Sequence, residues 1–195
     1  MNNDLLEKLN NFVIQNQINE AIDTAEKALI DMPTTDFHVI IGRNMLHLKD
    51  ELLAFIDNFY NQAIEKIDVK AIYSEMNGFT INYDLWYLDM FAYKQCEGLD
   101  DVDWLAYFNF AADSMMTISG FEDLQKVFED YMINEKYKDK TLATACEACE
   151  YLIILRLQEL FREVQTMAKN QNLVWHSISI FTTAHDYDLI YKTID

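Results

Sequence analysis

The longest uninterrupted helical pattern in this 195-residue chain spans residues 141–169, and it constrains the fold more than any other segment. Its middle, YLIILRL, is apolar on nearly every side. A helix that is apolar all round is normally buried, so this pattern predicts a central helix on which other elements pack. Apolar residues recur along the segment at helical spacing: Leu142, Cys146, Cys149, Ile153, Leu157, Leu160, Val164 and Met167.

Glycine and proline are rare in this chain, with four and one residues respectively. A many-stranded β-sandwich needs turn residues roughly every ten positions, so the composition argues against that fold and favours helices. The hydrophobic share of 51% is enough to bury a full core. We therefore expect one domain, 1–195, with an α+β core in 35–195. Residues 1–34 either join that core or stand on it as a small appendage.

Five further segments have helical patterns. Ser119, just before the segment 120–134, and Glu122 within it have the spacing of a capping box, which predicts that a helix starts there. Pro33 ends the second helix of the chain. The five predicted helices are 4–15, 18–31, 44–67, 104–116 and 120–134.

The first two of these helices predict an αα-hairpin. Its second half, NEAIDTAEKALIDMP, resembles the second helix of a tetratricopeptide unit, with Phe12, Ala21, Ala28 and Pro33 at about the expected spacing. The period does not recur later, and a lone unit does not make a solenoid. A peptide-binding or dimerising surface on this hairpin is the basis of one alternative function, that of an adaptor or scaffold.

Two pairs of strands are predicted. Asn77-Gly78 lies between strand-like runs and favours a tight hairpin turn, with Phe79, Ile81, Tyr83 and Leu85 on the inward face. The run 173–181 alternates again, and DLIYKTI near the end of the chain is expected to pair with it. The predicted fold is α+β: a helical N-terminus and a small, mainly antiparallel sheet built from hairpins, packed against several helices including the long central one.

The net charge of this chain limits the kinds of partner that it is expected to bind. Lys and Arg total 15 and Asp and Glu total 33, which gives a net charge of −18. Nucleic acid and anionic membrane surfaces both need basic patches, so neither is expected as a partner. The acidity either steers a basic protein partner or keeps an aromatic-rich surface soluble, and both explanations stay open.

No apolar run of eighteen residues occurs, the N-terminus is polar, and the cysteines are three: Cys96, Cys146 and Cys149. These features predict a reduced, cytoplasmic protein without a transmembrane helix or signal peptide. Cys146 and Cys149 are spaced for metal or redox chemistry, but they lie on the apolar stripe of the long helix and are expected to be buried. We expect no metal and no cofactor.

The segment His185-Asp186-Tyr187-Asp188 concentrates polar residues, and an Asx-rich turn accounts for it without a metal. An unrecognised hydrolase or metal-dependent enzyme centred on this segment and His176 remains the second alternative function. No nucleophile elbow, phosphate-binding loop or metalloprotease motif supports it.

An acidic and aromatic band follows the predicted hairpin. Its Trp and Tyr residues are of the type enriched at binding hot spots, and its carboxylates would steer a basic partner. The other arrangement, with aromatics inward and acids on a solvated loop, is the simpler explanation of the pattern and is somewhat favoured by it. The candidate interface consists of Asp84, Trp86, Asp89, Tyr93, Glu97, Asp100, Asp101, Asp103 and Trp104.

The overall type of the chain resembles bacterial immunity proteins of polymorphic or contact-dependent toxin systems. The segments that carry this resemblance are YDLWYLDMFAYKQCEGLDDVDW and GFEDLQKVFEDY. The resemblance implies tight binding to a cognate, often basic, toxin domain, and it implies neither catalysis nor a cofactor. A non-enzymatic, acidic protein-binding inhibitor is therefore the expected function.

Overall fold

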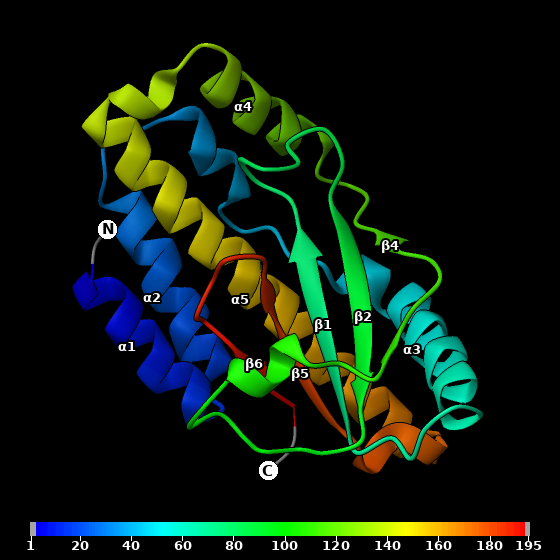
Figure 1. The fold of residues 1–195 in the computed structure, drawn as a ribbon. Helices are drawn as coiled ribbons and strands as arrows, with labels where there is room; N and C mark the ends of the chain where they lie inside the picture. Colours follow the sequence, from blue (N-terminus) through cyan, green and yellow to red (C-terminus); the bar gives the residue numbers. More distant parts are fainter. Residues whose placement is uncertain (1–2, 194–195) are drawn as a thin grey trace.

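The computed structural model describes residues 3–193 and shows an α+β fold built around one long helix, α5 (Lys140–Asn170) (Figure 1). The side chain of Asp139 caps this helix by accepting hydrogen bonds from the amides of Thr141 and Leu142, at 2.8 and 3.1 Å. The apolar middle of the helix, Tyr151–Leu155, is buried on all sides. The predicted central helix is thus confirmed. The other α-helices are α1 (Asn3–Ile14), α2 (Ile18–Ile30), α3 (Lys49–Ile64) and α4 (Glu122–Ile133).

The hairpin of α1 and α2 is part of the main core. Its apolar residues belong to the same buried cluster as α5, and α2 packs along that helix. Arg156 on α5 reaches across to Glu26 on α2 at 3.6 Å, and Arg162 donates to the Asn19 side chain at 2.9 Å. Residues 1–34 therefore do not form a separate core within the part of the chain that the structure describes.

The sheet has the strand order β3-β2-β1-β5-β6, and a short β4 also pairs with β2. All pairings are antiparallel except the one between β1 and β5, which is parallel. The sheet is therefore mainly antiparallel, as predicted, but its central pair is not. The strands are β1 (Ala71–Asn77), β2 (Tyr87–Tyr93), β3 (Phe110–Ala111), β4 (Met116–Thr117), β5 (Ser179–Ala184) and β6 (Tyr191–Lys192).

The two faces of the sheet have different surroundings. Ile72, Met76 and Met90 lie on the inner face and join the main core against α5. One end of the outer face is covered by the segment 96–107, whose Trp104 ring lies 5.0 Å from Tyr93 and 5.2 Å from Phe181, and Ile190 packs in the same cluster. Figure 1 shows the other half of β1 and β2 with no helix in front of it.

The turn between β1 and β2 differs from the prediction. These strands do pair, with Asn77 opposite Tyr87, but residues 78–86 form a long loop between them. Phe79 rather than Gly78 takes the left-handed conformation, with φ of 57°, and its ring is buried. Ile81 and Leu85, which were expected to face inward, are exposed. The alternating pattern misled because aromatic packing around Phe79 outweighs the strand preference of its neighbours.

Two helical predictions also need correction. The segment 104–116 holds only a 3₁₀ turn, Asp103–Ala106, followed by β3 and β4, because its apolar residues pair with and pack on β2. At the start of α4 the N-cap is Phe121, without a side-chain cap, and Glu122 accepts from the Gly120 amide at 2.9 Å instead. Residues Val174–Ser177 form a 3₁₀ turn before β5. None of the helices within residues 3–193 combines the length and the apolar character that crossing a membrane would require.

Candidate functional site

The uncovered half of the outer sheet face brings two carboxylates together. Glu75 on β1 lies directly opposite Asp89 on β2, and both side chains are half-buried. The Tyr73 hydroxyl donates to Glu75 at 2.8 Å, and the Asn77 amide donates to Asp89 at 2.9 Å. Burial and the neighbouring Glu75 charge raise the pKa of Asp89 above its ordinary value. Like charges opposite each other on adjacent strands are unfavourable unless a cation neutralises them.

Aromatic side chains lie beside these carboxylates. The Phe91 ring on β2 lies 4.8 Å from the ring of Phe108, which is half exposed. Tyr107, the preceding residue, is 76% exposed. We call Glu75, Tyr87, Asp89, Phe91 and Phe108 the outer-face patch.

In the structure the aromatic and the acidic residues of the predicted nine-residue interface differ in their exposure to solvent. The aromatic side chains of Trp86, Tyr93 and Trp104 are buried, so they pack in the core and do not reach a partner. Asp89 belongs to the outer-face patch. The other five are exposed, and within residues 3–193 none of them pairs with Lys or Arg: Asp84, Glu97, Asp100, Asp101 and Asp103.

Sequence reasoning missed Phe108 and Tyr107 as exposed aromatics, because their segment was expected to be helical. The acidic loop just before them was a sign that this stretch is solvent-exposed. Only the pairing of β3 with β2 shows that the Phe108 ring lies beside Phe91 on the outer face.

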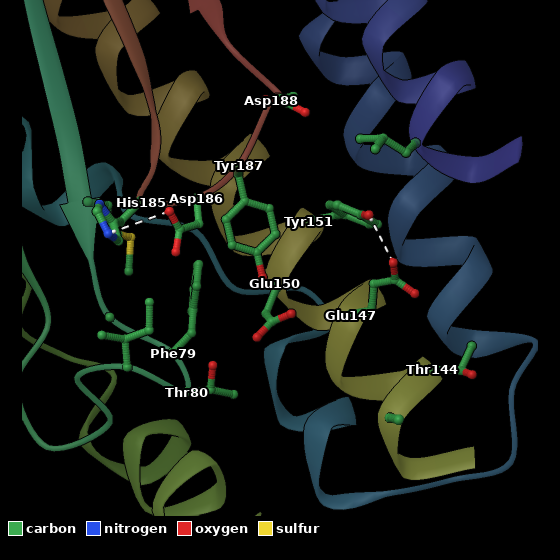
Figure 2. Close-up of a pocket in the computed structure, with 15 residues that line it drawn as sticks. Phe79, Thr80, Thr144, Glu147, Glu150, Tyr151, His185, Asp186, Tyr187 and Asp188 are labelled. Atoms are coloured by element: carbon green, nitrogen blue, oxygen red, sulfur yellow. Dashed lines mark hydrogen bonds and ion pairs between the residues drawn. The ribbon is translucent and has the colours of Figure 1, made fainter. Parts of the chain in front are cut away.

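A second feature is a cleft of about 490 Å³ at the carboxyl ends of β1 and β5, the parallel pair (Figure 2). One wall is formed by the loop residues 78–81 and 185–188, and the other by the first half of α5. Its lining is mainly apolar and aromatic, with carboxylates at Glu147, Glu150, Asp186 and Asp188. Crevices at the carboxyl ends of strands are frequent ligand sites.

The α5 wall follows from helical spacing. Thr144, Glu147 and Tyr151 recur at three- and four-residue intervals, so they share one face of the helix. The Tyr151 hydroxyl donates to Glu147 at 3.0 Å. On the opposite wall the Phe79 and Tyr187 rings meet edge to face with centroids 5.7 Å apart.

Glu150 is the buried carboxylate of the cleft. Only 8% of its surface is exposed, and burial raises its pKa from 4.5 to about 7. The Tyr187 hydroxyl and the Cys146 thiol donate hydrogen bonds to it, the second at 3.6 Å, and Figure 2 shows the tyrosine pointing at the carboxyl group. Within the described residues Glu150 has no Lys or Arg partner. A second hollow of about 380 Å³ also reaches Glu150, from the side of Tyr131.

The cysteines of the CEAC segment are buried, as predicted. Burial raises the pKa of the Cys146 and Cys149 thiols well above the ordinary value, so neither is a thiolate nucleophile near neutral pH. No group of three His, Cys, Asp or Glu side chains between residues 3 and 193 is arranged to hold a metal ion.

The histidines of the enzyme hypothesis lie apart. His176 precedes β5 and contacts the Leu173 carbonyl at 2.7 Å, whereas His185 follows the other end of that strand. His185 Nδ1 lies 2.6 Å from Glu75 Oε1, and this hydrogen bond raises the pKa of the imidazole. The structure therefore brings His185 together with Glu75 and Asp186, and leaves His176 outside the cleft.

Fold and site together define an acidic α+β protein with a carboxylate-bearing sheet face and an adjoining aromatic cleft. Comparison of the chain with protein-family models, with curated proteins and with solved structures gave no match.

Proposed function

We propose that this protein is a non-enzymatic, acidic protein-binding module of the immunity type, which binds and neutralises a basic toxin domain in the bacterial cytoplasm. The observation that carries the proposal is the outer-face patch. There, Glu75 and Asp89 lie opposite each other beside the partly exposed rings of Phe91 and Phe108. His185 already pairs with Glu75, so Lys or Arg side chains of a partner would chiefly neutralise Asp89 while their stems cover the rings.

The exposed acids of the neighbouring loop support the same proposal. Asp100, Asp101 and Asp103 lie on the segment that covers the other end of the outer face, without a Lys or Arg partner in the part of the chain described. They extend the negative potential of the patch and would speed the encounter with a basic surface. The three free cysteines accord with a reducing compartment.

Co-purification with the product of the neighbouring gene tests this proposal, followed by titration calorimetry and a toxicity-rescue assay. We expect a basic polypeptide to bind and the double variant Glu75→Gln, Asp89→Asn to weaken binding at least tenfold. Binding by the double variant equal to that of the wild type, or no binding by any basic neighbouring product, would contradict the proposal.

The adaptor function has one observation in its favour. A groove of about 600 Å³ runs between α1 and α2, lined by charged residues that include Lys8, Asp23 and Lys27. Deleting residues 1–34 would remove part of the main core, so charge reversals test this function better. The adaptor function predicts that Asp23→Lys with Lys27→Glu abolishes partner binding, and the immunity function predicts that binding survives.

A further inference from the structure

The cleft at the carboxyl ends of β1 and β5 holds a buried carboxyl group, Glu150, which has no Lys or Arg partner among residues 3–193. Glu150 lies at the junction of two hollows, of about 490 and 380 Å³. Arg156, one turn and a half further along α5, pairs with Glu159 and Glu26 and is not available to it. A buried carboxylate without a cation is unfavourable, and natural proteins normally pair such groups.

The donors already present leave Glu150 with free acceptor capacity. An ionised carboxylate accepts about four hydrogen bonds. The Tyr187 hydroxyl and the Cys146 thiol supply two, and both are neutral. Glu150 lines both hollows, and the larger one, of about 490 Å³, lies within the range of about 300–1,000 Å³ that is typical of pockets for small organic ligands.

The walls around Glu150 select the kind of group. Phe79, Tyr151 and Tyr187 present aromatic surface along the cleft, and Leu6 and Ile81 add aliphatic surface. Aromatic faces attract cations as well as apolar stems. The Asp186 and Asp188 carboxylates are exposed at the rim and favour the entry of positive charge (Figure 2).

We propose that this cleft binds a primary ammonium or guanidinium group on a short apolar stem, with the cationic head against Glu150 and the stem against Phe79, Tyr151 and Tyr187. This site is separate from the outer-face patch, although His185 touches both. The cationic group belongs either to a free amine or to a Lys or Arg side chain of a protein, and only in the second case does the site rest on the proposed function.

Titration calorimetry of the full chain at pH 8 tests the site with small probes. The probes are n-butylguanidinium, agmatine, acetyl-arginine methylamide and n-butylurea, the last being a neutral isostere of the first. We expect the guanidinium compounds to bind and the urea to bind at least tenfold more weakly. Glu150→Gln should weaken guanidinium binding at least tenfold, because a charge-assisted hydrogen bond is lost. The matched control, Glu51→Gln, makes the same substitution at an exposed position of α3 outside the cleft and should leave binding unchanged.

The outcomes separate the two sources of the cation. If acetyl-arginine methylamide binds, the natural ligand of the cleft is an Arg or Lys side chain of a protein. If agmatine binds and acetyl-arginine methylamide does not, the natural ligand is a free amine. Equal binding of butylurea and butylguanidinium, equal affinity of Glu150→Gln and wild type, or no binding of any cation would overturn the inference. These assays use no partner protein, so their failure is distinct from failure of the proposed function.

Discussion

The imidazole of His185, just after β5, lies 2.6 Å from the carboxylate of Glu75 on β1 and joins the outer sheet face to the cleft. The His185 amide also donates to the Met76 carbonyl at 2.9 Å, which extends the parallel ladder by one bond. One residue at the end of the parallel pair therefore fixes an acidic side chain of the outer-face patch and one wall of the cleft.

The His185–Glu75 pair should make stability depend on pH. Because Glu75 raises the pKa of the imidazole above 6.5, the native state holds the proton more tightly than the unfolded state. The stabilisation is full below about pH 6.5 and is lost as pH rises through the raised pKa. We expect Glu75→Gln to lower stability at pH 5.5 and to have less effect at pH 8.5, as measured by urea unfolding. In the His185→Gln background the same change should show no such pH dependence.

Glu150→Gln should stabilise the protein above neutral pH. The native carboxyl has a pKa of about 7 and the ordinary value is 4.5, so the native state loses stability as pH rises between these values. Glutamine does not ionise, and each pKa unit corresponds to about 1.4 kcal/mol. The expected gain is therefore about 3 kcal/mol at pH 8 and near zero at pH 4 in urea unfolding. An equal gain at both pH values would show that packing, not ionisation, is responsible.

Replacing Asp100, Asp101 and Asp103 with Ser should slow association with the basic partner. Exposed charges act mainly on the encounter rate, so we expect a loss of roughly tenfold in the association rate at low salt. Surface plasmon resonance at several salt concentrations measures it. The matched control replaces three exposed acids of the α3 region, Asp50, Glu51 and Glu65, and changes net charge equally. If both triple variants behave alike, the loop is not the steering surface.

Gly78→Ala should destabilise the protein through steric conflict. An added Cβ would lie 2.9 Å from Trp86 Cδ1, and the Trp86 side chain is fully buried and unable to move away. Overpacking of this kind costs about 1–3 kcal/mol. Gly98→Ala serves as the comparison, because Gly98 has φ of 93° but open space around it, and about 1 kcal/mol is expected there. Urea midpoints should rank Gly78→Ala as the less stable variant; the reverse order would mean that the loop yields easily.

Local patterns were sufficient for much of the fold. The apolar stripe of 141–169 predicts a helix that the structure places at Lys140–Asn170, and the α1–α2 hairpin and α4 were likewise anticipated. Each depends on contacts between residues near in sequence, whose spacing the chain itself displays. The acidic character of the surface is also a property of the sequence alone.

The sequence could not reveal which residues meet across the fold. The parallel pairing of β1 with β5 joins segments about a hundred residues apart, and it creates both the His185–Glu75 contact and the cleft. The sequence indicated that Gly78 is needed for a tight turn. In the structure a glycine is needed there because the Trp86 ring leaves no room for a Cβ atom. Trp86 and Trp104 were candidates for a binding surface, and the tertiary structure buries them and leaves Phe108 and Tyr107 exposed.

The sequence by itself therefore determined the α+β class, the central helix and the excess of negative charge, because helical periodicity and composition are local properties. Only the tertiary structure decided that Glu75 faces Asp89, that Glu150 lies buried beside Tyr187, and that the aromatic band splits into core and surface. These outcomes depend on the burial of side chains from distant segments against one another, and no local pattern encodes that arrangement.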